Sequence, residues 1–487
     1  MTKRFPSPTA DGTAVAVQAD GVVSVHPIPP PPEGTAAVTP VDDAVHPPSA
    51  PIPPPRDGRA RQRSLDATFS SLPDSLILLA LAVVFLGGHL LMLWQAIEFK
   101  DMTAVDVSLY GAWVEHGWST GWWMGVNLEW VYPVGALAPM LLAAVFGTDG
   151  PYLGTWCAMI GLLNLATMLV AVRLVSLRRA ALPLAGWFVF LGLLGPVGIA
   201  RLDAVMMPLV LLALLVAGAR PALASCLVTV SAWIKVAGAG VMAPLLAVAR
   251  SWRERLLGVV LPAALTCLGV VLTHRLAGGD LKTLTSFAWI EGERGLQVEA
   301  VLATPVVLAH AIKGEPLAHW NNEIATMETW GPGAEAAIRV SDFAMPAVVV
   351  LVGLLCWLGR RRATDSLLLG SLAILVGLIV THKVGSPQFI AWAAPPAVAA
   401  LCLRRSHGFW GPIMAALLAA AALTNLLYPW LYHSFLGGQP LALAVWVLRN
   451  LILVGVLTAA VVALIKLARV CAAERPRGAL AEAKAKV

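Results

Sequence analysis

Charged residues are scarce in this 487-residue chain, because only 13% of its residues are Asp, Glu, Lys or Arg. That share is about half of what a typical soluble domain carries. Hydrophobic residues make up 58%, and the mean hydropathy is +0.76. This composition excludes a soluble globular protein and predicts an all-α polytopic membrane protein. Since one apolar crossing takes roughly 20 residues, the chain after Pro73 has room for about 12 transmembrane helices (10–12).

Cysteine pairs of the metal-binding or redox type are also missing. None of the six cysteines belongs to a CxxC pair, and five lie in apolar runs, where a thiol serves as a small apolar filler. No DxD-type or histidine-cluster site is present in the sequence. We therefore expect no metal and no cofactor. The net charge of +6 is small for this length, and its basic residues form short clusters between apolar runs. That pattern indicates membrane topology and not a nucleic-acid partner.

An apolar run near the N-terminus is absent, since the first one begins near Leu76, so no cleavable signal peptide is expected. Proline gathers instead in the first 72 residues, with PPPP at residues 29–32. We interpret residues 1–72 as a disordered cytoplasmic tail. As an alternative, the tail could be a proline-motif ligand of a partner domain. The whole chain could likewise be a scaffold that recruits partners through this tail.

The basic clusters predict the topology. Arginines at 56–63 precede the first apolar run, Leu76–Ile97, so both termini are placed in the cytoplasm by the positive-inside rule. The predicted transmembrane domain covers residues 73–470, with outer loops at 98–150 and 277–342 and a cytoplasmic tail at 471–487. Residues 133–146 are too short to cross comfortably and are expected to form a surface or re-entrant segment. Two short helices are expected to flank Lys235, and the expected range of 10–12 helices depends on whether this pair crosses the membrane.

This topology gathers polar side chains at the outer face of the membrane, where ionisable groups indicate a functional site. They come from five separate parts of the sequence: Asp101, Asp106, Glu129, Arg201, Asp203, Arg294, Gln297, Glu299, His382, Lys383 and Gln388. An enzyme would use a carboxylate as general base beside cations that hold an anionic leaving group. A transporter would place paired charges at mid-membrane and show internal repeats. We find no convincing repeat, so the pattern favours an enzyme.

Asp106 follows the first apolar run within the segment DVSLY, which ends at Tyr110. It is our candidate general base, and Asp101 is its rival. An N-cap of an interfacial helix is the alternative role for Asp106. The tryptophans of the first outer loop suit either an interfacial aromatic belt or stacking against sugar rings. Lys235 could pair with Asp203 or extend to one membrane surface, and we do not assign it a catalytic role.

Several segments in this order resemble the glycosyltransferases of family 87, which are GT-C-type, polyprenol-phosphate-mannose-dependent α-mannosyltransferases of actinobacteria. The segments are DVSLY at 106–110, the Tyr132–Pro133 element, the Arg201/Asp203 pair, the lysine-centred hairpin at 233–244, RGLQVE at 294–299 and KVGSPQFIAW at 383–392. Val134 departs from the family pattern, where a second proline is common. The resemblance covers residues 75 to 465.

The resemblance implies a GT-C-like fold in the plasma membrane, with the active site facing the extracytoplasmic side. It further implies an inverting transfer of mannose from a polyprenyl-phosphate donor to a glycolipid or glycan acceptor. Asp106 would be the base. Cations for the lipid phosphate would come from Arg201, Arg294, His382 and Lys383, and sugar contacts from Gln297, Glu299 and Gln388, with Asp101, Tyr110, Glu129, Tyr132 and Asp203 also facing the substrates. The alternative is that these charged side chains only reach out to the membrane surface and do not bind a substrate.

Two other functions stay open at this point. One is transfer of a different lipid-linked sugar, such as a pentose of the arabinofuranose kind. The other is a transporter or flippase of lipid-linked sugars or other small solutes.

Overall fold

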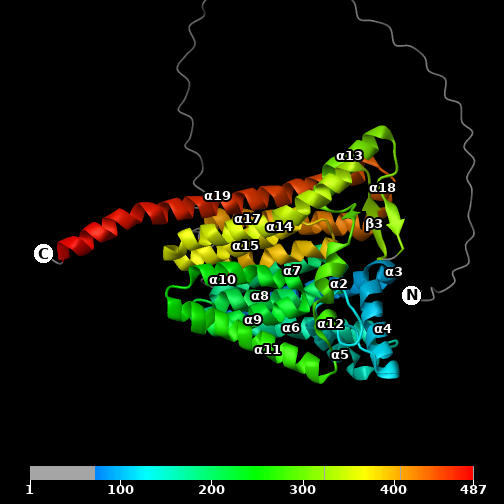
Figure 1. The fold of residues 1–487 in the computed structure, drawn as a ribbon, viewed down its shortest axis with the longest axis horizontal. Coiled ribbons are helices and arrows are strands. Elements are labelled where there is room, and N and C mark those ends of the chain that lie inside the picture. Colours follow the sequence, from blue (N-terminus) through cyan, green and yellow to red (C-terminus); the bar gives the residue numbers. More distant parts are fainter. Residues whose placement is uncertain (1–71, 323, 406, 486–487) are drawn as a thin grey trace, which may run out of the picture. The chain divides into compact units, whose positions relative to one another are not determined.

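The structure is a computed structural model that describes residues 72–322, 324–405 and 407–485. Most of the predicted proline-rich tail therefore lies outside the described residues. The described chain is mainly helical, as the composition predicts. Helices run side by side in Figure 1, and elements of the two predicted outer loops, among them α4 (Val105–Thr120), α12 (Leu281–Gly292) and β3 (Thr326–Thr329), lie together at its right-hand end.

In the part of the chain that the structure describes, eight helices are long and apolar enough to cross a membrane, by length and composition. They are Asp74–Glu98, Tyr152–Val175, Leu177–Gly198, Glu254–Leu276, Pro332–Leu358, Arg360–Thr381, Gly408–Trp430 and Pro440–Glu474. Four shorter apolar helices would bring the number to twelve if they also cross: Asp203–Val216, Pro221–Ile234, Val236–Val248 and Pro387–Cys402. Twelve crossings therefore remain a prediction.

The elements have the following bounds. The helices of the first half are α2 (Asp74–Glu98), α3 (Lys100–Thr103), α4 (Val105–Thr120), α5 (Leu137–Ala143), α6 (Tyr152–Val175), α7 (Leu177–Leu194), α8 (Asp203–Val216), α9 (Pro221–Ile234) and α10 (Met242–Val248). Those of the second half are α11 (Leu261–Leu276), α12 (Leu281–Gly292), α13 (Thr304–Lys313), α14 (Pro332–Leu358), α15 (Ala363–Thr381), α16 (Ala394–Cys402), α17 (His407–Asn425), α18 (Tyr432–Leu436) and α19 (Pro440–Ala485). Short 3₁₀ segments that matter for the site are η1 (Val134–Ala136), η3 (Gly195–Gly198), η4 (Val236–Val241) and η8 (Pro387–Ala393).

The core forms around α7, α8, α15 and α16, whose side chains are mostly buried. The apolar window of α15 is 78% buried and that of α7 is 72% buried, whereas the windows of α11 and α14 are only 17% buried. Helices that are apolar all round and yet exposed are unstable in water but suit contact with lipid. The peripheral helices therefore present the expected surface of a membrane protein.

The predicted outer loops are not irregular. The first contains α3, α4, η1 and α5, and the second contains α12, α13 and a small antiparallel sheet in the order β1-β3-β2. The sheet pairs β1 (Leu296–Gln297) with β3 (Thr326–Thr329), and β3 with β2 (His319–Asn321). The sequence did not predict this sheet. Helix α14 also begins at Pro332, inside the predicted outer loop at 277–342.

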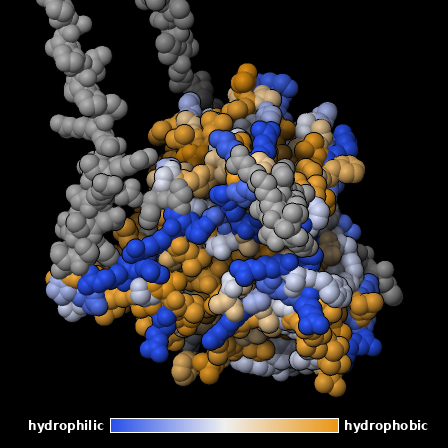
Figure 2. Space-filling model, turned by 90° about the vertical axis from the view of Figure 1, so that its left-hand side faces the viewer, coloured by the Kyte–Doolittle hydropathy of each residue, from blue (hydrophilic) through white to orange (hydrophobic). Residues whose placement is uncertain are grey.

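The opposite end of the helices carries the basic clusters. Arg362, between α14 and α15, pairs with Glu474 of α19 at 2.8 Å, and Arg405, after α16, pairs with Asp365 at the start of α15. Figure 2 shows this left-hand side of Figure 1, where hydrophilic residues in blue form bands between hydrophobic ones in orange. Helix α19 continues through most of the predicted C-terminal tail, to Ala485.

Candidate functional site

Asp106 lies in the first turn of α4, where the helix dipole favours a negative charge. Its Oδ2 is 2.8 Å from Nε of Arg201. The side chain of Asp106 is 31% exposed and that of Arg201 only 7%. The carboxylate is thus held from the protein side and still reaches solvent, as a base that meets an incoming hydroxyl requires.

Arg201 lies in the short connection between η3 and α8. Its Nη1 donates to the carbonyl oxygen of Ala200 at 2.9 Å and to that of Thr103, which ends α3. The guanidinium therefore joins the start of α8 to the first outer loop. Asp203 begins α8 itself, and its Oδ1 accepts from the indole Nε1 of Trp392 at 2.5 Å. The two charges of the Arg201/Asp203 pair thus hold two different segments, α4 and η8.

Aromatic rings continue from Asp106 toward the interior. Tyr110, one turn after Asp106 on α4, has its ring centroid 6.3 Å from that of Tyr132. The ammonium of Lys235 lies 4.9 Å from the Tyr132 ring centroid and 5.4 Å from that of Phe389. Residues four apart share one face of a helix, so Asp106 and Tyr110 face the same direction, and Tyr132 connects them to Lys235.

Tyr132 also lines a cavity of about 410 Å³. Its wall is mostly apolar, and its polar members are Tyr132, Lys235, Glu291, His382 and Trp392. These come from the first outer loop, the α9–η4 break, α12, the α15–η8 loop and η8. An apolar cavity with a few convergent polar groups is the usual form of a small-molecule site.

Two polar groups of the cavity wall, Glu291 and His382, have partners of their own. Glu291 pairs with Arg294 at 3.1 Å, one turn along the chain. His382 accepts a hydrogen bond at Nδ1 from the backbone N–H of Val384 at 2.8 Å. A neutral ring that accepts at Nδ1 carries its proton at Nε2. His382 can therefore donate one hydrogen bond from Nε2.

Desolvation lowers the pKa of His382 to about 4; Glu291 opposes this shift, and the charges of Lys235, Lys383 and Arg294 reinforce it. Because the folded pKa lies below the ordinary value of 6.5, the ring is neutral at pH 7 and gains a proton only as the pH falls toward 4. We expect the ratio of the activities of wild type and His382→Gln to stay constant from pH 5.5 to 7.5. A pH profile of both proteins measures this. A change in the ratio around pH 6.5 would contradict a neutral His382.

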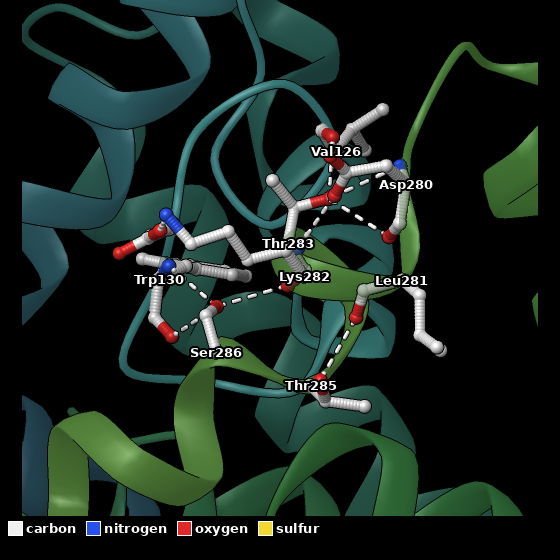
Figure 3. Close-up of polar contacts among 9 residues, drawn as sticks. Val126, Trp130, Asp280, Leu281, Lys282, Thr283, Thr285 and Ser286 are labelled. Carbon is white, nitrogen blue, oxygen red and sulfur yellow. Dashed lines mark hydrogen bonds and ion pairs between the residues drawn. The ribbon is translucent and has the colours of Figure 1, made fainter.

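A clamp of hydrogen bonds fastens the first outer loop to α12 (Figure 3). The hydroxyl of Ser286 accepts from the backbone N–H of Trp130 at 2.9 Å and donates to the carbonyl of Trp130 at 3.0 Å. Thr283 donates to the carbonyl of Val126 at 2.8 Å. Lys282 pairs with Glu129. These contacts hold Tyr132 near the cavity face of α12, which carries Glu291.

Ser286→Ala is expected to lower the free energy of unfolding by about 1–3 kcal/mol, because it leaves the buried Trp130 N–H without a partner. Thr285→Ala is the matched control. Its hydroxyl only donates to the carbonyl of Leu281 within α12 (Figure 3) and is exposed, so the change should stay within about 0.5 kcal/mol. Denaturation in detergent measures both variants. Equal stability of the two would show that the clamp contributes nothing.

The motif residues of the second outer loop lie in a neighbouring network. Glu299 accepts from the hydroxyl of Tyr432, and Arg449 of α19 donates to the Glu299 carbonyl at 2.7 Å. Burial raises the pKa of Glu299, although the hydrogen bond from Tyr432 opposes the shift. The Oε1 of Gln297 accepts from the backbone N–H of Gly385 at 3.0 Å. Any side chain at Gly385 would collide with the backbone of Ala300 at 2.1 Å, so glycine is required for this contact.

The remaining predicted residues are not among those that line the cavity. Lys383 donates from Nζ to the carbonyl of Gly292 at 2.6 Å and lies 3.7 Å from Asp342. Asp101 is exposed on α3, Gln388 is buried in η8, and Glu129 belongs to the clamp. Their predicted substrate contacts stay predictions.

Sequence reasoning missed the part that Lys235, Glu291 and the rings of Phe389 and Trp392 play in the cavity. For Lys235, the available signal was a lysine within an apolar run. For Glu291, it was the spacing of three residues to Arg294. In the part of the chain that the structure describes, no group of three or more His, Cys, Asp or Glu side chains could hold a metal ion.

Comparison with known protein families gives a match. The profile of glycosyltransferase family 87 matches residues 130–387, which include Tyr132, Arg201, Lys235, Glu291 and His382 but begin after Asp106. No curated protein and no solved structure matches the chain. The matched segment is more than half of the 487 residues and carries the cavity. The chain therefore belongs to glycosyltransferase family 87 and is a glycosyltransferase with several membrane-type helices.

Proposed function

We propose that this glycosyltransferase transfers mannose from a polyprenyl-phosphate donor to a glycolipid or glycan acceptor with inversion at the anomeric carbon. The observation that carries the proposal is the partly exposed Asp106 carboxylate, fixed by Arg201 and linked through Tyr110 and Tyr132 to an apolar cavity. A base at one end and an apolar cavity at the other suit a sugar carried on a lipid.

In the proposed reaction the acceptor hydroxyl oxygen attacks the anomeric carbon from the side of Asp106. Its proton passes to the Asp106 carboxylate as the new glycosidic bond forms. The bond from the anomeric carbon to the phosphate oxygen breaks on the opposite face. The electron pair leaves with polyprenyl phosphate, whose developing charge is stabilised by nearby donors. Attack opposite the leaving group inverts the configuration.

Aromatic rings between Asp106 and the apolar cavity support the binding of a sugar ring between the two. Tyr132 and Trp392 line the cavity, and Trp392 is fixed by its bond to Asp203. Aromatic faces pack well against the apolar faces of sugar rings, while carboxylates and amides bind hydroxyls. The proposal places this site on the extracytoplasmic side of the plasma membrane, since the basic helix ends would face the cytoplasm.

The test uses the full-length protein in nanodiscs with radiolabelled polyprenyl-phosphate mannose and a glycolipid extract. Label that moves to the extract with inverted configuration supports the proposal. Transfer only from a polyprenyl-phosphate pentose would overturn the sugar and keep the class of donor. Transfer only from a nucleotide sugar would overturn the donor. Uptake of solute into sealed vesicles without any covalent transfer would favour a transporter.

A further inference from the structure

We propose that Lys235 is the phosphate anchor of the cavity and that the apolar wall beside it receives the first isoprene units of the lipid. This inference rests on the proposed function, because it takes the donor to be a lipid phosphate. It gives the phosphate to a lysine to which the sequence alone assigned no role.

The position of Lys235 results from a break in the helix. α9 ends at Ile234, Lys235 has an extended backbone with φ −147° and ψ 120°, and η4 begins at Val236. A residue at such a break leaves the regular helix, and Lys235 contributes to the cavity wall. A helix break at membrane depth is tolerated where it lines a cavity, so the break itself indicates a site.

Lys235 also differs from the other cations around the site. Arg201 pairs with Asp106, Arg294 with Glu291, and Lys383 is bound to the Gly292 carbonyl. Among the residues that the structure describes, no carboxylate lies within 4.0 Å of the Lys235 ammonium. Its neighbours are the rings of Tyr132 and Phe389. An ammonium held between rings is free to bind an oxyanion by charge-assisted hydrogen bonds.

Two carboxylates act on this charge, and each has a nearer partner of its own, although the partner of Asp203 is the neutral indole of Trp392. Glu291 lines the same cavity but pairs with Arg294 at 3.1 Å. Asp203 accepts from Trp392 at 2.5 Å. His382, with its proton at Nε2, adds a neutral donor to the same wall. A phosphate at Lys235 would therefore meet a cation and a donor.

The wall next to Lys235 favours a lipid over a soluble phosphate. Val236 and Ala239 of η4 and Val349 of α14 line the cavity. Val236 is 48% exposed, and α14 is one of the least buried long helices. The cavity thus borders the apolar surface that faces lipid. A polyprenyl chain could extend from this side, whereas the phosphates of a nucleotide would lose hydration there without further cations.

A close backbone contact fixes the two walls relative to each other. A Cβ at Gly135 would lie 2.6 Å from the carbonyl oxygen of Trp233, which precedes Lys235 by two residues. Only glycine allows the loop after Tyr132 to pack this tightly on the end of α9. The ring and the ammonium are therefore positioned by the backbone, not only by each other.

The test measures direct binding of undecaprenyl phosphate and of neutral undecaprenol to the full-length protein in nanodiscs. Wild type should bind the phosphate more tightly than the alcohol. Lys235→Met should weaken binding of the phosphate about 10- to 100-fold and leave the alcohol unchanged. Lys235→Arg should restore part of the difference. Lys313→Met removes an exposed charge from α13 and serves as the matched control, with no change expected.

Each outcome decides the inference. If Lys235→Met still binds undecaprenyl phosphate more tightly than undecaprenol, as wild type does, Lys235 is not the anchor. This holds even if transfer from a lipid-phosphate donor is observed. Equal binding of phosphate and alcohol by wild type would overturn the phosphate site. Inorganic phosphate that competes at millimolar concentration would overturn the need for a lipid chain. A third result separates this inference from the proposed function. If wild type binds undecaprenyl phosphate, Lys235→Met does not, and no sugar transfer is observed, the inference stands while the proposed function fails.

Discussion

Asp106→Asn is expected to reduce sugar transfer by about 10²- to 10⁴-fold, the usual contribution of a general base. Asn has the same shape and keeps an oxygen that can accept from Arg201, so the fold and the binding of undecaprenyl phosphate should persist. Initial rates of transfer, together with the melting temperature and lipid binding of the same preparation, measure the effect. The loss should appear in kcat and not in binding of the donor.

Asp101→Asn is the matched control for this prediction. Asp101 lies five residues earlier, on the exposed side of α3. Its substitution should leave the rate within about twofold, because surface changes of this kind have small effects. If Asp101→Asn abolishes transfer and Asp106→Asn does not, the base is Asp101, and the ion pair of Asp106 with Arg201 is structural.

Much of the fold follows from the apolar runs of the sequence. The long runs predict the spans, and the two short helices on either side of Lys235 are present as α9 and η4–α10. The N-terminal half of α14 escaped prediction because it is not apolar, although Pro332 at its start and Glu335 in its first turn are typical of a helix N-terminus. The strands β1 and β2 have two and three residues, which is too short for an alternating pattern.

The composition of the site was less predictable than its location. The motifs indicated which segments meet, and Arg201, Tyr132 and His382 do lie around Asp106 and the cavity. The motifs did not indicate which cation has a carboxylate partner. Lys383 lies in the same motif as Gln388, but its ammonium turns to Gly292 of α12. Pairing of this kind depends on distances between segments that are far apart in sequence, so a single sequence does not contain it.

The second large effect is expected for Arg201→Met. The substitution removes the partner of Asp106 and the donors to the carbonyls of Thr103 and Ala200, all at a side chain that is 7% exposed. Breaking one side of a buried pair costs about 3–5 kcal/mol. Because Asp106 is 31% exposed and water can replace part of the interaction, we expect a loss of about 2–4 kcal/mol in the free energy of unfolding.

Transfer should fall at the same time, since Asp106 loses the contact that orients it. Arg201→Lys is not expected to rescue either property, because one ammonium cannot reproduce the fixed fork of a guanidinium that contacts α4, α3 and Ala200 together. Arg362→Met is the control: its pair with Glu474 is exposed on both sides, so stability should hardly change. Denaturation in detergent and transfer rates measure all three variants.

In a double-mutant cycle, Asp106→Asn combined with Arg201→Met should lose little more activity than either change alone, because the two side chains act as a unit. Full additivity of the two losses would mean that Arg201 acts on the substrate and not through Asp106.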